Sequence, residues 1–224
     1  MTHKVAPWSF SKIKAFEQCP KQFYHEKILK EHPFKETEAI LYGSAFHKMA
    51  EDFIALDTPV PAKFKFAEKM LTVLKTRRGT KLCEVKLGVT ENLEACDFYA
   101  ADVWFRGIAD LVILDEGTAT VVDYKTGKSA QYADKGQLEL MALTVLARYP
   151  QITKVRAALM FVVSKDLVKD VYMEYDKSKL WGKWLGKYNR MKIAADNDVW
   201  NARPSGLCRR HCPVIECVHN GVNA

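Results

Sequence analysis

Residues 104–127 read Trp-Phe-Arg-Gly-Ile-Ala-Asp-Leu-Val-Ile-Leu-Asp-Glu-Gly-Thr-Ala-Thr-Val-Val-Asp-Tyr-Lys-Thr-Gly, and this stretch decides the fold. Two apolar runs rich in β-branched residues flank the turn at 115–117, so the simplest interpretation is a β-hairpin inside a core. Each run carries a carboxylate near its end, Asp110 in the first and Asp123 in the second. Side chains two residues apart in a strand project from the same face, so Lys125 places an ammonium beside Asp123.

The two carboxylates of this hairpin indicate a metal site. From neighbouring strands, Asp110 and Asp123 can converge, and two close carboxylates repel each other unless a cation lies between them. Hard oxygen ligands suit Mg²⁺ or Mn²⁺. The alternative is an ordinary surface Asp-x-Lys pair. Because Asp123 follows the apolar residues 119–122, and a buried unpaired carboxylate is costly, the site interpretation is favoured.

Taken in order, these motifs resemble the core of the PD-(D/E)xK nucleases, in the RecB-like branch. The pattern there is Gly-x-x-Asp, then Asp-x-Lys-Thr-Gly, then a glutamine that opens a helix, and residues 107–110, 123–127 and 137 match it. The resemblance implies a divalent ion bound by the two aspartates and by the carbonyl of Tyr124. It also implies that the lysine polarises the attacking water and that the glutamine positions the water or the scissile phosphate. The implied catalytic residues are Lys125, Asp110, Asp123 and Gln137.

A predicted helix over residues 41–54, with Ser44 near its start, carries a further candidate ligand. A lone histidine on a helix is more often structural, but Gly-Ser-Ala-Phe-His at 43–47 is similar to the family's Gly-x-x-x-His segment. The resemblance therefore places His47 in the Mg²⁺ or Mn²⁺ site. Glu84 lies in a predicted strand where some RecB-like nucleases carry a glutamate near the metals, yet an exposed strand glutamate is the default expectation here.

The whole chain is expected to form one α/β domain, residues 1–224, with a central mixed sheet of about five strands flanked by helices. Its 224 residues are 48% hydrophobic and 27% charged, as in globular proteins. No apolar run approaches the length of a membrane span, and the N-terminus lacks a signal-peptide pattern. An intracellular, cytoplasmic protein is expected. The predicted strands are 82–89, 104–114, 118–124, 155–164 and 167–175, and the predicted helices are 9–19, 41–54, 61–78, 137–149 and 178–195.

The net charge of +7 and the pI near 9.0 suit an anionic partner such as DNA. In the predicted helix 178–195, cations recur at a spacing of three to four residues. Such a stripe is usually a solvated face, but beside a nuclease core it is also suited to phosphate contacts. The residues of this candidate DNA-binding face are Lys179, Lys183, Lys187 and Arg190.

Three cysteines close to the C-terminus indicate a second metal site. Cys208, Cys212 and Cys217 lie within ten residues, which is typical of a metal-binding loop, and Cys19 is the candidate fourth ligand. The arrangement resembles the [4Fe-4S] site of RecB-like nucleases of the AddB type and of CRISPR spacer acquisition, in which one cysteine precedes the core and three follow it. The resemblance implies a cluster that joins the segment around Cys19 to the tail 204–224.

The cysteine spacing departs from that family pattern. It is Cys-x3-Cys-x4-Cys here instead of Cys-x2-Cys-x5-Cys, and His211 stands where the middle cysteine would be. Zinc, with His211 as a ligand, therefore stays an alternative to the cluster, and a metal-free tail is the third case.

Three functions remain open at this stage. The first is a metal-dependent DNA nuclease, with exonuclease preferred over endonuclease by analogy to the cluster-bearing relatives in recombination and repair. The second is a nucleic-acid-binding accessory module without turnover, and the third is a zinc-stabilised interaction domain. A helicase or recombination partner protein, the oligomeric state and the polarity of digestion are not given by the sequence.

Overall fold

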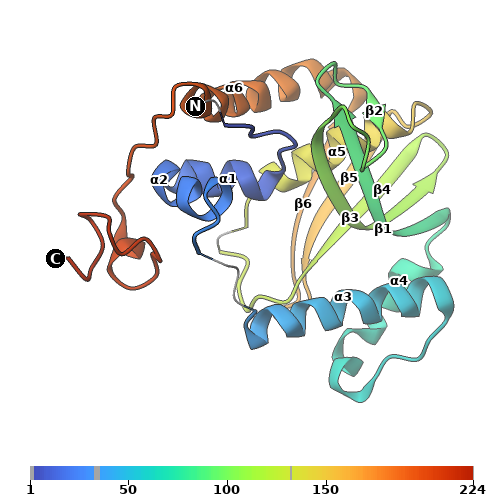
Figure 1. Ribbon diagram of the computed structural model, residues 1–224. Helices are drawn as coiled ribbons and strands as arrows, with labels where there is room; N and C mark the ends of the chain where they lie inside the picture. Colours follow the sequence, from blue (N-terminus) through green and yellow to red (C-terminus); the bar gives the residue numbers. More distant parts are fainter. Residues whose placement is uncertain (1–2, 33–35, 132, 224) are drawn as a thin grey trace. The chain divides into compact units, whose positions relative to one another are not determined.

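The computed structural model describes residues 3–32, 36–131 and 133–223 (Figure 1). The chain divides into two compact units. The first, here called the terminal unit, comprises residues 1–35 and 181–224, and the second, the sheet unit, comprises residues 36–180. Within the described ranges, no helix has the length and apolar character needed to cross a membrane. The expectation of a single domain stays a prediction.

The sheet unit alternates helices and strands around one sheet. Its elements are α3 (Glu38–Leu56), the 3-10 turn η2 (Ala62–Ala67), α4 (Glu68–Thr76), β1 (Thr80–Thr90), β2 (Ala95–Cys96), β3 (Val103–Asp115), β4 (Thr118–Lys125), α5 (Gly136–Arg148), β5 (Lys154–Phe161), β6 (Asp166–Met173) and η3 (Glu174–Asp176).

The sheet is mixed and has the strand order β2-β1-β3-β4-β5-β6. β4 and β5 are parallel and are joined through α5, as a parallel pair requires a crossover, while the other neighbours are antiparallel. The predicted hairpin is confirmed, with Leu111 opposite Val122 and Asp115 opposite Thr118. The predicted α/β class is also confirmed. The prediction of about five strands missed β2, whose two residues are too few to give an alternating pattern.

Helices cover both faces of the sheet, because β3 and β4 are apolar on both sides (Figure 1). On one face, Val112 and Val121 pack with Leu138 and Ala142 of α5. On the other face, α3 and α4 pack on the sheet through a second apolar cluster. The strand residues in this second cluster include Leu111, Ile113, Val122 and Tyr124. The two clusters hold the central hairpin between helices, so its polar residues have fixed surroundings.

Two helix boundaries in this unit differ from those expected. α3 begins at Glu38, not near Ser44, because the hydroxyl of Thr37 accepts a hydrogen bond from the backbone N–H of Ile40 at 3.3 Å and caps the helix. α4 ends at Thr76, and Gly79 forms the turn that leads into β1. The helix predicted from residue 61 begins as a 3-10 turn.

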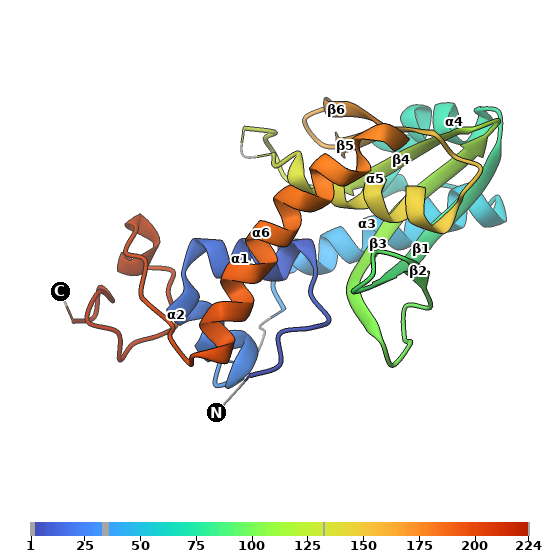
Figure 2. The ribbon, with the colours of Figure 1, turned by 90° about the horizontal axis from the view of Figure 1, so that it is seen from above.

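The terminal unit combines both ends of the chain. Its elements are α1 (Phe10–Gln18), α2 (Pro20–Phe23), the π-helical turn η1 (Tyr24–Ile28), the part of α6 (Lys177–Asp196) that follows Leu180, and η4 (Gly206–Arg209). Figure 2 shows α1 beside α6. Both Lys187 and Arg190 form ion pairs with Glu17, at 2.9 and 3.0 Å, and Trp200 stacks on Tyr24 with ring centroids 5.0 Å apart. Ser9 caps α1, since its hydroxyl accepts a hydrogen bond of 3.3 Å from the backbone N–H of Lys12.

Gly79 tests the turn before β1. It has φ +111°, and a Cβ at this position would overlap the carbonyl oxygen of Leu114. We expect Gly79→Ala to lower the free energy of unfolding by more than about 1 kcal/mol in urea titrations followed by circular dichroism. The matched control is Gly182→Ala in α6, where a Cβ meets no heavy atom within 4 Å. It should stabilise by about 0.5–1 kcal/mol, and equal effects of the two changes would contradict the assignment.

Candidate active site

The candidate site residues, which are those predicted together with Glu84, come from both faces of the sheet and from its centre. His47 lies on α3, Glu84 on β1, Asp110 on β3 and Gln137 on α5. β4 contributes Asp123, Tyr124 and Lys125 at its end.

Three side chains form a group that can hold a metal ion. Ligand atoms of His47, Glu84 and Asp110 all lie within 4.8 Å of one another. The ring nitrogen Nδ1 of His47 is 3.2 Å from Asp110 Oδ1, and Nε2 is 3.1 Å from the carbonyl oxygen of Tyr124. Asp110 Oδ2 accepts a hydrogen bond of 2.6 Å from the backbone N–H of Tyr124, which fixes β3 against β4 at the site. One imidazole and two carboxylates suit Mn²⁺, and the carboxylates also suit Mg²⁺.

Asp123 and Lys125 form the pair that the sequence predicted. Lys125 Nζ lies 2.6 Å from Asp123 Oδ2, and the amide of Gln137 donates a hydrogen bond of 2.5 Å to Asp123 Oδ1. Asp123 is 4% exposed, and this burial raises the pKa of its carboxyl to about 6, although Lys125 opposes the shift. The charge of Asp110 raises the same pKa further, so the two aspartates are near enough to repel each other.

Charges also act on the histidine. Burial alone would lower the pKa of His47, but the hydrogen bond and charge of Asp110, and then the charges of Asp123 and Glu84, outweigh it. The pKa of His47 therefore lies above its ordinary value. The site thus has an excess of negative charge that attracts either a proton or a metal ion.

Glu84 is the site residue that sequence reasoning set aside. The default of an exposed strand glutamate was wrong: Glu84 is half-buried, and burial followed by the charge of Asp110 raises the pKa of its carboxyl. Its backbone has φ +50°, a left-handed conformation inside β1 that is unusual for a residue with a side chain. Its neighbours Cys83 and Val85 pair with Leu111 and Ala109, which brings Glu84 beside Asp110. The family resemblance pointed to this placement, but the strand register that establishes it is not given by the local sequence.

A groove of about 500 Å³ lies beside the metal-binding group. It is bounded by residues 43–51 of α3, which make more than two helical turns, and by Glu84 of β1, so a ligand in it would reach His47 and Glu84 directly. Its lining residues are Gly43, Ser44, His47, Lys48, Glu51 and Glu84.

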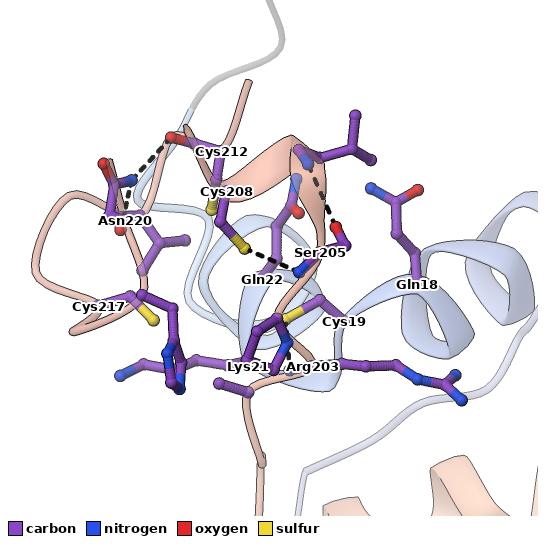
Figure 3. A pocket seen from close by; sticks show the side chains of 15 residues that line it. Gln18, Cys19, Lys21, Gln22, Arg203, Ser205, Cys208, Cys212, Cys217 and Asn220 are labelled. Carbon is purple, nitrogen blue, oxygen red and sulfur yellow. Dashed lines mark hydrogen bonds between the residues drawn. The ribbon is translucent and has the colours of Figure 1, made fainter. Parts of the chain in front are cut away.

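The four cysteines assigned to a second metal site line one pocket of the terminal unit. Figure 3 shows Cys19, Cys208, Cys212 and Cys217 around it. Burial and the neighbouring cysteine thiolates raise the pKa of Cys212, which reflects how close the four sulfurs are. Two sulfurs also accept backbone hydrogen bonds of 3.4 Å, Cys19 from Arg203 and Cys208 from Ser205. The donor set fits a metal that prefers thiolates.

The histidine near this pocket is not the one considered from the sequence. His219 lines the pocket, whereas His211 is exposed and does not. The two cysteines left out of the prediction, Cys83 and Cys96, lie on β1 and β2 of the sheet unit.

The candidate DNA-binding face on α6 is partly neutralised. Glu17 pairs with Lys187 and Arg190, and Lys183 lies over the ring of Trp184 with its nitrogen 5.6 Å from the centroid. Lys179 is exposed. Cations that are already paired contribute less to phosphate binding. DNA binding by the α6 face stays a prediction.

Comparison with known proteins identifies the family. The model of the PD-(D/E)XK nuclease superfamily matches residues 7–75 and 61–217. The chain belongs to this superfamily. No curated protein sequence matches the chain. Nucleases of this superfamily use divalent metal ions, which agrees with the group formed by His47, Glu84 and Asp110.

Two solved structures are similar to this PD-(D/E)XK chain. One is SSO0001, with 16% identity over 94% of this chain and 85% of that chain, at a TM-score of 0.48. The other is named "Putative exonuclease" and comes from Eubacterium rectale, with 14% identity over 89% of this chain and 85% of that chain, at a TM-score of 0.53. At 14% identity, the similarity to the Eubacterium rectale structure shows a shared fold and nothing further.

The buried carboxylate of Asp123 should cost stability when no metal is bound. Its folded pKa of about 6 is above the ordinary 3.8, so the folded state is penalised progressively as pH rises from about 4 to 6 and fully above that range. We expect Asp123→Asn to raise the free energy of unfolding of the metal-free protein by about 1–2 kcal/mol at pH 7 and by little at pH 4. Urea titrations with chelator at both pH values measure this.

The matched control is Asp166→Asn at the exposed start of β6, which should show no such pH trend. A variant of Asp123 that is less stable than wild type at pH 7 would contradict the charge argument.

Proposed function

We propose that the chain is a metal-dependent deoxyribonuclease of the RecB-like branch that hydrolyses phosphodiester bonds at DNA ends. The observation that supports it is the position of Lys125, whose nitrogen is 2.6 Å from the buried carboxylate of Asp123. This carboxylate in turn interacts with the charges of Asp110 and His47 in the metal-binding group. An acidic group for a cation beside an ammonium is the arrangement that phosphodiester hydrolysis requires.

One set of site residues would bind the metal ion, and another would orient the attacking water. Mg²⁺ or Mn²⁺ would be held by His47, Asp110 and Asp123, with Glu84 and the carbonyl of Tyr124 as further donors. When bound, the ion supplies a Lewis acid that polarises the phosphate and increases the acidity of a water molecule. Neutral imidazole and carboxylate donors fit this role, and the excess negative charge of the site draws the cation in.

Lys125 and Gln137 act on the reacting atoms. The Lys125 side chain is 34% exposed, so its ammonium can donate a hydrogen bond to the attacking water or to a non-bridging oxygen of the phosphate. Gln137 holds Asp123 Oδ1 and leaves Oδ2 turned to Lys125. The water oxygen forms a bond to phosphorus while the bond to the leaving oxygen breaks on the opposite side.

We assign DNA binding to the terminal unit because this unit carries the excess of positive charge. Residues 1–35 and 181–224 contain 14 Lys and Arg against 6 Asp and Glu, a net charge of +8. Residues 36–180 contain 20 against 21, a net charge of −1. The whole excess of positive charge thus lies outside the unit that carries the catalytic group, and phosphate contacts depend on such an excess.

The cysteine pocket is proposed to hold a [4Fe-4S] cluster, ligated by Cys19, Cys208, Cys212 and Cys217. The backbone hydrogen bonds to two of the sulfurs are of the kind that tunes such clusters. Zinc with three cysteines and a histidine is the alternative, and His219 is the histidine that lines the pocket. Either metal would join residues distant in sequence and restrain the unfolded chain.

Exonuclease is preferred over endonuclease. The Eubacterium rectale protein with this fold carries an exonuclease name, and the cluster-bearing relatives that the motifs resemble process DNA ends. A binding module without turnover is the second candidate, but the set of His47, Asp110, Asp123 and Lys125 is intact. A helicase or recombination protein is the partner expected to supply unwound ends.

Lys125→Ala tests the nuclease assignment. We expect a loss of cleavage of at least about 100-fold, because the variant lacks the group that stabilises charge in the transition state. Binding of labelled DNA in the presence of chelator should change little. The assay follows end-labelled single- and double-stranded DNA with Mn²⁺, Mg²⁺ or chelator, with Lys69→Ala on the exposed side of α4 as control.

The outcomes separate the candidates. Cleavage by Lys125→Ala at the wild-type rate would contradict the role of Lys125, and DNA binding by wild type without metal-dependent products would favour the accessory module. Products that shorten from one labelled end indicate an exonuclease, whereas internal cuts in circular DNA indicate an endonuclease.

Cys19→Ser tests the second metal site. Wild type purified without oxygen is expected to be brown and to absorb near ~400 nm, and the variant should lose this absorption together with bound iron. Cys96→Ser, outside the pocket, is the control and should keep the colour. A colourless wild type with a zinc ion that Cys19→Ser loses would show that the cysteine pocket holds zinc in place of the cluster.

A further inference from the structure

A second group of metal-ligating side chains lies in the terminal unit, apart from the cysteine pocket. Ligand atoms of His25, Glu31, His32 and Glu216 all lie within 4.8 Å of one another. None of these residues lines the cysteine pocket. Three of them come from a segment of eight residues near the N-terminus, and the fourth comes from the C-terminal tail.

The backbone around His25 is shaped to bring these groups together. Residues Tyr24–Ile28 form a π-helical turn, a rare element that is often found at functional sites. Lys30 follows with φ +59°, a left-handed conformation that is costly for a lysine. The chain thereby turns back, and the backbone N–H of Glu31 donates a hydrogen bond of 3.1 Å to the carbonyl of His25. The π-helical turn and the left-handed Lys30 together place Glu31 and His32 beside the turn that carries His25.

The side chains complete the convergence. Nδ1 of His25 lies 2.6 Å from Glu31 Oε2 and 3.1 Å from Glu216 Oε1. The rings of His25 and His32 are 6.3 Å apart. Nε2 of His32 is buried and has no hydrogen-bond partner within the described part of the chain. A buried polar nitrogen without a partner destabilises the folded state, so this atom calls for a ligand.

Ion pairs of His25 with the two carboxylates would account for three of the four residues. They explain the short distances to Glu31 and Glu216, but they leave Nε2 of His32 without a partner. A cation that takes one donor from each residue satisfies all four. It also neutralises two carboxylates that otherwise repel each other across one imidazole.

We propose that His25, Glu31, His32 and Glu216 form a zinc site. Two imidazoles and two carboxylates are a complete tetrahedral donor set for Zn²⁺. Donor atoms of such a site are about 3.4 Å apart, so a group already within 4.8 Å closes around the ion by small side-chain movements. Imidazole disfavours Ca²⁺ and Mg²⁺, which take oxygen ligands. The proposal does not rest on the nuclease assignment.

The zinc site has a consequence for the cysteine pocket. Glu216 precedes Cys217 directly, and His25 follows Cys19 by six residues. Zinc bound by His25 and Glu216 would fix the same two chain segments that the cysteines join. The tail would then be joined to the N-terminal segment at two separate points.

Zinc binding to the whole protein tests the site. Titration with Zn²⁺, followed by calorimetry and by thermal unfolding, should show one bound ion per chain beyond those held by the His47 group and the cysteine pocket, and a rise in Tm. His32→Ala and Glu216→Gln are expected to weaken this binding by at least about tenfold, because even outer-shell partners of a zinc site contribute 10- to 100-fold. The iron–sulfur absorption, or the metal content of the cysteine pocket, should not change in either variant.

The controls separate this site from the cysteine pocket. His211→Ala alters a histidine of the same tail outside both the group and the cysteine pocket and should leave the zinc affinity unchanged. His219→Ala alters the histidine of the cysteine pocket and shows whether zinc binds there instead. His32→Cys keeps a zinc ligand and should retain binding, which guards against simple misfolding of the alanine variant. Zinc affinity equal to wild type in both His32→Ala and Glu216→Gln would overturn the proposal, as would zinc binding lost only in His219→Ala.

Discussion

The structure depends on keeping several carboxylates close together where water has little access. Asp110 and Asp123 are 8% and 4% exposed, and Glu84 is half-buried beside Asp110. Burial and mutual repulsion both oppose this arrangement, and the ammonium of Lys125 and the imidazole of His47 only partly offset them. The uncompensated negative charge favours the binding of a further cation, and on the proposed function that cation is the divalent metal ion.

The mixed sheet makes this concentration of charge possible. Its two central strands, β3 and β4, are packed on both faces, so the site can be reached by helices from either side. α3 supplies His47, and α5, which crosses over from β4 to β5, supplies Gln137 to the carboxylate of Asp123. The apolar residues of α3 and α5 that cover the sheet also fix the positions of His47 and Gln137 at the site. A change in how these helices pack on the sheet would therefore also move the candidate site residues.

How much the sequence predicts depends on the range of the interactions. The hairpin, its turn and the Asp123–Lys125 pair follow from local alternation and were predicted correctly. The role of Glu84 was missed, because its left-handed backbone and its position opposite Asp110 arise from strand register, which alternation cannot supply. β2 and the start of α3 were missed for local reasons. Two residues give no alternating pattern, and the cap at Thr37 starts α3 three residues before the predicted start at residue 41. The convergence of His25 with Glu216 spans nearly the whole chain and has no signal in either segment alone.

The unequal distribution of charge has a consequence for how the enzyme would respond to ionic strength. The sheet unit is nearly neutral, whereas the terminal unit has a net charge of +8. Added salt screens the attraction between exposed cations and phosphates over a distance of about 8–10 Å, but it acts weakly on buried groups. On the proposed function, salt would slow the arrival of DNA and leave the turnover of DNA already bound almost unaffected. The rate of DNA binding could then change with ionic strength while the rate of hydrolysis stays the same.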